Sequence, residues 1–303
     1  MDELSGLFDG DVYSDADTFR ARLTASRLAH PQTDNLYALY AARIKQIPFQ
    51  YKPLLRLLRA DRPRLLIADE VGVGKTIEAG LILKELQARQ RLDNVIIICP
   101  KALVTKWRAE MRRFDEDFHI LNSEMLRNCL RETHLDGAWP IQHARSIIPL
   151  EVIRKEEYLS GIPGPPKRYG LLELDPPPRF DLLVVDEAHH VRTPETHSHS
   201  VVRFLADESE AADFLSATPV HIGSQNLFAL LNLLRPDLFP DHAVFEEMVA
   251  PNRHIPQGMR FLRTQGVGWA ENAGDALAAA ANTPWGAVAL AADTRFSVWA
   301  PLL

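Results

Sequence analysis

The stretch 65-LLIADEVGVGKTIEAGLILKEL-86 passes from an apolar run through a glycine-containing loop into a segment with helical periodicity. Gly72 and Gly74 let the loop backbone turn its N–H groups toward a phosphate, and a helix that starts near Lys75 adds the positive end of its dipole. The usual phosphate-loop pattern, G-x-x-x-x-G-K-[ST], has glycine where this chain has Asp69. The stretch is therefore either a nucleotide site of a particular subtype or a plain strand-to-helix turn. The order of strand, glycine loop and helix favours the site.

Two adjacent carboxylates end another apolar run, 180-FDLLVVDEAHH-190. Ligands of α/β sheets bind where the strands end, so Asp186 is expected to hold Mg²⁺ and Glu187 to orient or deprotonate an attacking water. In the phosphate loop, Lys75 is expected to reach the β- and γ-phosphates and Thr76 to supply a hydroxyl to Mg²⁺. Alone, the two acids could equally be an acidic strand end with a solvated loop. Together with the phosphate loop they favour a catalytic site.

The composition is that of an ordinary globular protein, with 303 residues, 46% hydrophobic and 24% charged residues, and a formal net charge of -6. This charge argues against passive coating of nucleic acid, although a local basic stripe remains possible. The two cysteines are too few for a disulfide framework, which favours a reducing compartment. The acidic N-terminus has no signal pattern, and no run approaches the roughly 18 apolar residues of a membrane span. We expect a cytoplasmic protein without a membrane partner.

Short apolar runs alternate with helical stretches along the chain. Continuous rather than alternating runs are typical of strands buried on both faces, and alternation with helices indicates an α/β fold with a mainly parallel sheet covered by helices on both faces. The expected strands are 65–68, 95–99, 182–186 and 213–217, with weaker candidates at 118–121 and 146–150. The expected helical segments include 18–30, 35–47, 50–60, 77–90 and 101–114, and the proline-rich residues 161–179 are expected to form a surface loop.

Three parts are predicted from these patterns. Residues 1–34 form an acidic segment with a short helix, residues 35–250 form the main domain, and residues 251–303 form an Ala- and Trp-rich helical tail.

The segments DEVGVGKT, DEAHH and SATP follow one another in the order found in helicase superfamily 2. The longer form D-E-x-G-x-G-K-T-I-E-A-G resembles the Snf2 branch, in particular bacterial Snf2-like ATPases of the RNA-polymerase-associated type. The stretch IIICPKALVTKWRAEM resembles motif Ia, and IPFQYKPLLRLL resembles the adenine-recognising glutamine segment. The resemblance covers about residues 35–250 and implies one RecA-like phosphate-loop lobe.

The resemblance also implies roles for individual residues. It implies ATP and Mg²⁺ as ligands and double-stranded DNA as a partner, with Lys101 near the DNA backbone. Lys75, Asp186 and Glu187 would be catalytic, Thr76 and Asp186 would hold the metal, and His189, Ser216 and Thr218 would couple the ATP site to the nucleic acid. The ATP-binding set would be Gln50, Asp69, Glu70, Gly72, Val73, Gly74, Lys75 and Thr76.

A complete motor of this family has a second RecA-like lobe, which supplies arginine fingers. No second motif set follows SATP, so we expect a single lobe, and the tail resembles the start of a truncated inter-lobe region. Two functions stay open: an ATP-driven DNA translocase or remodeller, and a nucleotide-binding module that needs a second lobe in trans. An unrelated phosphate-loop NTPase is disfavoured by the ordered DEAH and SATP segments.

Two further clusters have plainer interpretations. The string 189-HHVRTPETHSHS-200 holds four histidines, but no cysteine or carboxylate joins them at structural-zinc spacing, so a solvated loop is favoured over zinc. The segment 101–114 carries five basic residues that could contact phosphates or form a solvated helix face. Trp107, within that segment, is expected to pack in the core.

Overall fold

The computed structural model describes residues 36–37, 43–69, 72–217, 224–290, 292–293 and 296. The predicted N-terminal helix at 18–30 lies outside these residues, as do Glu70 and Thr218 of the predicted site.

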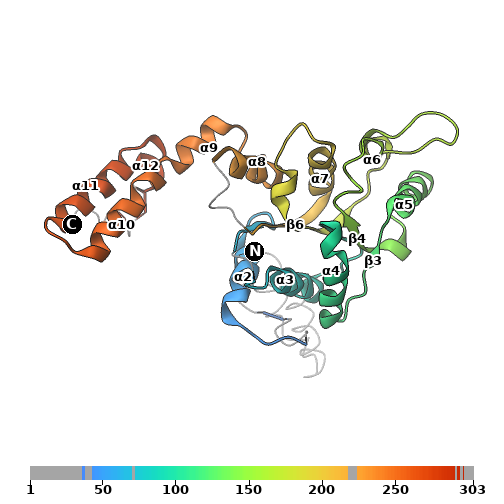
Figure 1. The fold of residues 1–303 in the computed structure, drawn as a ribbon, viewed down its shortest axis with the longest axis horizontal. Helices are drawn as coiled ribbons and strands as arrows, with labels where there is room; N and C mark the ends of the chain where they lie inside the picture. The colour runs from blue at the N-terminus through green and yellow to red at the C-terminus, as the bar shows by residue number, and fades with distance from the viewer. Residues whose placement is uncertain are drawn as a thin grey trace, which may run out of the picture. The chain divides into compact units, whose positions relative to one another are not determined.

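A six-stranded, fully parallel sheet organises the fold, with helices on both sides of it (Figure 1). Its strand order is β1-β6-β5-β2-β4-β3. The α/β prediction is therefore confirmed, and both weak strand candidates are real strands. The strands are β1 (Arg64–Ile67), β2 (Val95–Cys99), β3 (His119–Ile120), β4 (Arg145–Pro149), β5 (Phe180–Val185) and β6 (Ser209–Leu215). The central strand β2 is buried along its whole length, as the continuous apolar run predicts.

The register aligns the carboxyl ends of four neighbouring strands. Ile67 of β1 pairs with Leu215 of β6, and Val185 of β5 pairs with both Phe214 of β6 and Ile98 of β2. The loops that follow these strands therefore leave the sheet at one common edge. In open parallel sheets this edge is where ligands bind.

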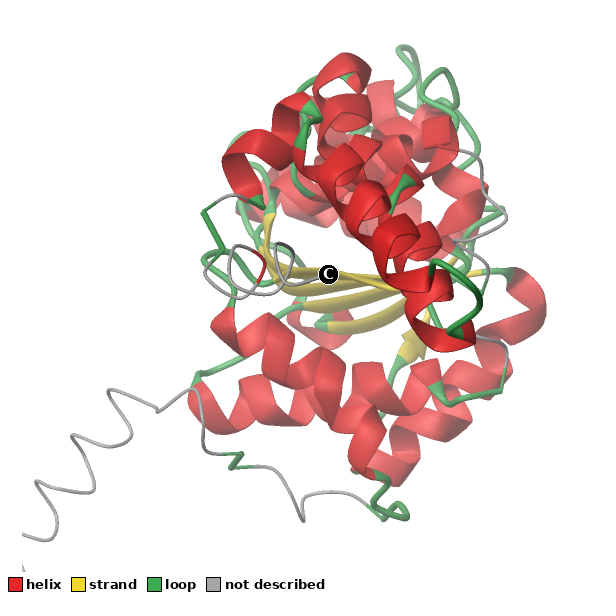
Figure 2. Cartoon of the chain, turned by 90° about the vertical axis from the view of Figure 1, so that its left-hand side faces the viewer, coloured by secondary structure: helices red, strands yellow, loops and turns green. Residues whose placement is uncertain are grey.

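The helices around the sheet are α2 (Lys52–Arg59), α3 (Lys75–Arg89), α4 (Val104–Met111), α5 (Ser123–Asp136), α6 (Glu157–Ser160) and α7 (His197–Asp207). The connections β1–α3–β2 and β2–α4–β3 run one way across the sheet, whereas the next three connections run back. Since such crossovers are right-handed, α3 and α4 cover one face, and α5, α6 and the end of α7 cover the other. Figure 2 shows the yellow strands as a layer between helices.

One predicted helix is partly wrong. Residues 43–47 of the predicted segment 35–47 are not helical, and a 3₁₀ helix begins instead at Pro48. Proline disfavours helical backbone in the residue before it. The proline-rich stretch 161–179 is a loop as predicted, apart from one β-bridge between Ile162 and Arg168 and a 3₁₀ turn at Leu171–Glu173.

The chain divides into two compact units, residues 1–187 with 204–217 and residues 188–203 with 218–303. The first holds the sheet, and the second begins at Ala188 and includes the start of α7. Its further helices are α8 (Ser224–Leu234), α9 (His242–Val249), α10 (Ile255–Thr264), α11 (Trp269–Ala281) and α12 (Pro284–Ala289). The described part of the tail is thus helical, as predicted. No helix in the described residues is long and apolar enough to cross a membrane.

Candidate nucleotide-binding site

The phosphate loop leads from β1 into α3 through two glycines with positive φ. Gly72 has φ +92° and Gly74 has φ +100°, a region that residues with a Cβ rarely adopt. Helix α3 begins at Lys75, so its N-terminal N–H groups lie beside the loop. Lys75 Nζ donates to the backbone oxygen of Asp69 at 2.9 Å. The loop therefore presents backbone donors and one ammonium group on the same short turn.

Gln50 lies against this loop and is only 5% exposed. Its Nε2 donates to the backbone oxygen of Val73 at 2.8 Å. A Cβ at position 74 would collide with the same amide nitrogen, so a larger residue there would displace the Gln50 amide, besides straining the positive φ. The glutamine is thus placed to support the loop, while its recognition of adenine stays a prediction.

Most of the predicted site residues line one cleft of about 360 Å³, which we call the phosphate cleft. Gly72, Gly74, Lys75 and Thr76 contribute from the loop and α3, and the acids at the end of β5 contribute from two strands away in the sheet. The predicted residues in its lining are Gly72, Gly74, Lys75, Thr76, Asp186 and Glu187. The structure therefore brings the two main motifs together around a single opening.

Asp186 is held firmly at the end of β5. It is 7% exposed, its Oδ2 accepts a hydrogen bond from Trp107 Nε1 at 2.7 Å, and its Oδ1 accepts one from the Glu187 backbone at 2.8 Å. Sequence reasoning missed the polar role of Trp107: the residue is buried as expected, but it also orients the carboxylate. The only signal was an indole placed on the helix after the Pro-Lys turn.

Glu187 adopts a left-handed backbone with φ 50°. This region is uncommon for a residue with a side chain, and non-glycine residues held there cluster at functional sites. The sharp turn lets the two successive acids both reach the cleft although they are neighbours in the chain.

Glu78, one turn into α3, is a buried acid that sequence reasoning did not single out. It is 0% exposed. The pKa of Glu78 is raised to about 7. Burial is the main cause and the Asp69 carboxylate adds to it, whereas Lys75 acts in the opposite direction. Its sequence signals were its place among the apolar residues of α3 and its place in the D-E-x-G-x-G-K-T-I-E-A-G pattern. The base of the phosphate loop therefore contains two acids, Asp69 and Glu78, around one lysine.

The predicted coupling residues are only partly described. Ser216 is 0% exposed, its backbone N–H donates to Ile67 at 3.0 Å, and its hydroxyl has no hydrogen-bond partner among the described residues. His189 lies in a 3₁₀ helix at the start of the second unit, with its ring 4.2 Å from that of His190. Neither position tests a coupling role.

Two arginines of the basic segment 101–114, both in the 3₁₀ helix that follows α4, are paired with acids. Arg112 pairs with Asp117 at 3.3 Å and Arg113 pairs with Glu110 at 2.8 Å. Lys106 and Arg113 line the phosphate cleft, a position that the sequence did not reveal. Lys101 instead lies in a separate cleft of about 510 Å³, where its backbone N–H donates to Glu151 at 2.9 Å.

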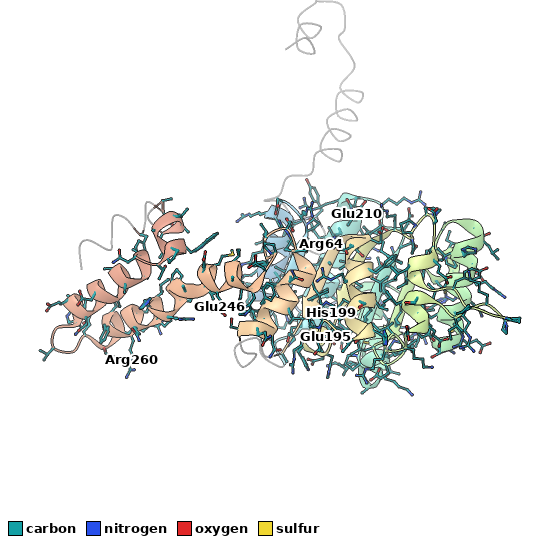
Figure 3. All side chains as sticks on the ribbon, turned by 90° about the horizontal axis from the view of Figure 1, so that it is seen from above. Arg64, Glu195, His199, Glu210, Glu246 and Arg260 are labelled. Atoms are coloured by element: carbon teal, nitrogen blue, oxygen red, sulfur yellow. The ribbon has the colours of Figure 1, made fainter. Side chains whose placement is uncertain are left out.

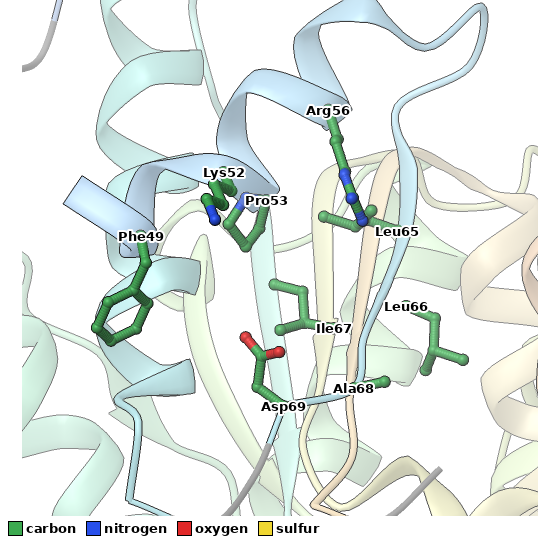
Figure 4. Close-up of a pocket in the computed structure, with 9 residues that line it drawn as sticks. All are labelled: Phe49, Lys52, Pro53, Arg56, Leu65, Leu66, Ile67, Ala68 and Asp69. Carbon is green, nitrogen blue, oxygen red and sulfur yellow. The ribbon is translucent and has the colours of Figure 1, made fainter. Parts of the chain in front are cut away.

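A further pocket, of about 250 Å³, lies along β1 beside the phosphate loop (Figure 4), and we call it the Phe49 pocket. Phe49, Lys52 and Arg56 border it from the side of α2, and Asp69 borders it at the loop. An aromatic ring, two cations and a strand edge therefore lie next to Gln50.

The histidine string is partly helical, and one of its four histidines is buried. His197, His199 and Ser200 belong to α7, and His199 is 5% exposed. In the part of the chain that the structure describes, no group of three or more His, Cys, Asp or Glu residues could hold a metal ion.

Comparisons with known proteins identify the fold and the family. The fold is similar to the SWI2/SNF2 ATPase core of Sulfolobus solfataricus in complex with double-stranded DNA, with a TM-score of 0.52 and 17% sequence identity. The match covers 72% of this chain but 42% of the other, so this chain spans less than half of that protein's length. The family model of the SNF2-related domain matches residues 49–267, which include the phosphate loop and both acids. The chain belongs to the family of SNF2-related domains.

Proposed function

We propose that the chain is the ATP-binding lobe of an Snf2-like, DNA-dependent ATPase of the bacterial RNA-polymerase-associated type. It would hydrolyse ATP to move along double-stranded DNA or to remodel complexes on it. The observation that carries the proposal is the single cleft lined by Lys75, Thr76, Asp186 and Glu187. Phosphoryl transfer depends on positioning and charge stabilisation, and these side chains supply both.

The residues of the cleft fit a magnesium nucleotide. Mg²⁺ prefers oxygen ligands and usually takes one or two carboxylates together with substrate phosphates and water. The Thr76 hydroxyl and the Asp186 carboxylate, oriented by Trp107, offer such oxygens. The bound ion would neutralise charge that develops on the β- and γ-phosphates.

The protein's own side chains then divide the work. Lys75 would turn from the Asp69 carbonyl, where it lies at 2.9 Å, to the phosphate oxygens. Glu187 would orient a water and accept its proton, and the turned backbone at φ 50° aims that carboxylate at the cleft. Gln50 and the Phe49 pocket would take the adenine end of the nucleotide.

Double-stranded DNA is the proposed partner. The structural neighbour is described in complex with double-stranded DNA, and Lys101 lies in a cleft at the carboxyl edge of the sheet. Glu151 accepts the Lys101 backbone N–H there, so a DNA phosphate at that turn would have to displace a carboxylate.

A nucleotide-binding module that needs a second lobe in trans is the alternative. The described residues form one sheet, and the arginine fingers of such motors come from a second lobe. In this case the chain would bind ATP tightly but turn it over slowly until the other lobe is added.

ATP hydrolysis by the chain, with and without duplex DNA, tests the proposal. DNA-stimulated turnover should fall at least about 100-fold in Lys75→Ala and in Glu187→Gln, while Lys155→Ala, an exposed lysine outside the cleft, should match the parent. ATP binding without turnover would favour the module. Neither binding nor turnover in a folded protein would overturn both.

A further inference from the structure

A second polar cleft, of about 380 Å³, lies in the second unit. It is formed by the loop before α7, by one face of α7, by α8 and by the start of α9. Its lining includes the charged and polar side chains of Arg192, Glu195, His199, Arg203, Asn232 and His242. The proposed ATP reaction uses none of them.

His199 is the most informative of these side chains. It is 5% exposed, and its Nδ1 lies 2.8 Å from the backbone oxygen of Val191. Since a carbonyl only accepts, Nδ1 carries the proton and Nε2 of the neutral ring has a free lone pair. Among the described residues, Nε2 has no hydrogen-bond partner. The ring thus lines the cleft with one nitrogen that no described residue hydrogen-bonds; Figure 3 labels His199 on α7.

A metal ion is the first ligand that this ring suggests, since metal-bound histidines often donate their other N–H to a carbonyl. Two observations oppose it. The described residues contain no group of three or more His, Cys, Asp or Glu side chains that could hold a metal ion. The positive charge of Arg203 also lowers the pKa of His199. A site with two arginines in its lining repels cations and attracts anions.

The two arginines are placed to bind an oxyanion. Arg203 lies one turn beyond His199 on α7 and is held by a hydrogen bond from its Nη2 to Asn232 of α8. Arg192 lines the cleft from the preceding loop and makes no ion pair with a described residue. Guanidinium groups bind phosphate oxygens in pairs. Among the described residues, Glu195 supplies the one carboxylate that lines the same cleft.

We propose that this cleft binds a phosphate group, free or in a nucleic-acid backbone, between Arg192, Arg203 and the protonated Nε2 of His199. The site is separate from the ATP cleft and does not depend on the proposed reaction there. The anion and the proton bind together, because Nε2 can donate only after the ring has taken up a proton.

The surroundings of His199 make this coupling measurable. Burial lowers the pKa of His199 and Arg203 lowers it further, whereas the bond to Val191 and the Glu195 carboxylate raise it. Arg192 lines the same cleft from the loop and His242 lines it from α9, and the described residues of α8 in the lining carry only amides and apolar groups. His242 lies 3.4 Å from Glu246 on its own helix. A bound dianion would favour the charged ring and raise its pKa.

The test is NMR titration of the histidine rings in the full chain carrying Lys75→Ala, which removes the main cation of the phosphate loop. Sulfate, which keeps its charge through the titration, and inorganic phosphate are the probes. His199→Gln identifies the signal. Each anion should raise the pKa of His199 by about one unit, and Arg192→Gln should abolish the rise. Arg260→Gln, an exposed arginine of the same unit (Figure 3), should leave it unchanged.

A short DNA duplex is the second arm. A rise with duplex that phosphate competes away identifies the nucleic-acid backbone as the source, and a rise with the small anions alone identifies free phosphate. An unchanged pKa with every probe, or an equal rise in folded Arg192→Gln, overturns the proposal.

Discussion

Asp186 and Asp213 belong to neighbouring strands of one sheet, yet their carboxyl groups have opposite surroundings. Asp186 follows β5 at the carboxyl edge, where an indole N–H and a backbone N–H hold it at 2.7 and 2.8 Å. Asp213 lies inside β6 opposite Val184, is 0% exposed, and has no hydrogen-bond partner among the described residues for either oxygen.

The difference shows that position along a strand decides what an aspartate can do. Burial raises the pKa of Asp213 to about 8, although Arg64 lowers it. A carboxylic acid in that state is neutral and cannot serve a metal. The edge of the sheet supplies donors that keep Asp186 oriented, whereas the interior supplies none.

The largest expected effect comes from Asp186→Asn. The amide removes a negative charge from the proposed Mg²⁺ site, so ATP hydrolysis should fall about 100-fold or more. Asp181→Asn changes the same residue type at the other end of β5, where its carboxylate accepts backbone N–H groups of Asp93 and Asn94. It should leave turnover within about two-fold of the parent. An equal loss of ATP turnover in Asp186→Asn and Asp181→Asn would mean that both changes act through protein stability and that Asp186 has no special role.

Asp213→Asn should change stability and leave the active site alone. Below pH 3.8, the ordinary value, both folded and unfolded chains keep the proton; as pH rises toward about 8, only the unfolded chain releases it, and stability falls. Each pH unit in this range lowers the parent's free energy of unfolding by about 1.4 kcal/mol. The stability of the asparagine variant relative to the parent should therefore increase by a few kcal/mol as the pH rises from 5 to 8. Denaturant unfolding at several pH values measures this.

Glu210→Gln is the control for that series, because Glu210 is exposed on the same strand (Figure 3). Its stability should follow the parent at every pH. A parent whose stability is flat from pH 5 to pH 8 would show that Asp213 is not held neutral.

Trp107→Phe sharpens the comparison by removing one donor from Asp186. Hydrogen bonds to charged groups are worth about 1.5–3 kcal/mol, so turnover should fall about ten-fold and half-saturation should need more Mg²⁺. Trp139→Phe is the matched change, since its indole donates to the backbone of His143 at 2.9 Å in the same unit. That variant should lose stability but keep the parent's Mg²⁺ requirement. An equal rise in the half-saturating Mg²⁺ concentration in both variants would show that Trp107 does not orient Asp186.

The smallest effect is expected at Lys106, which extends the comparison from acids to cations. Lys106 lines the phosphate cleft, whereas Arg108, two residues on along α4, lies 3.7 Å from Asp117 and outside that lining. Lys106→Ala should weaken ATP binding about three-fold, as expected for a partly solvated cation, and Arg108→Ala should not. Fluorescent-nucleotide titration resolves the two.

The strands and the phosphate loop could be predicted because each depends on a local pattern. Continuous apolar runs predicted four of the strands, weaker runs at 118–121 and 146–150 predicted the other two, and Gly72 and Gly74 predicted the turn. The contacts of Trp107 with Asp186 and of Gln50 with Val73 could not, because they join residues 79 and 23 positions apart. Which side chains meet depends on strand order, and no local pattern encodes it.

The same limit explains the misjudged surroundings. The histidine string was expected to be a solvated loop, but His199 lies on α7 and is only 5% exposed, in a cleft that residues of α8 and α9 also line. Glu78 was hidden for a similar reason: a glutamate in an apolar helix face can be read as an exposed residue until the neighbouring strand is placed.

The strand order has a consequence for how the protein is made. β1, which delivers the phosphate loop, pairs only with β6 among the described strands, and Arg64 lies opposite Ala212. Long-range pairings of this kind form slowly. During synthesis on the ribosome, β1 can pair with β6 only after Leu215 has emerged. The phosphate loop, although it is synthesised early, therefore becomes attached to a paired strand only at that point. A nascent chain released before that point would carry every residue of the phosphate loop and still lack the strand on which the loop is built.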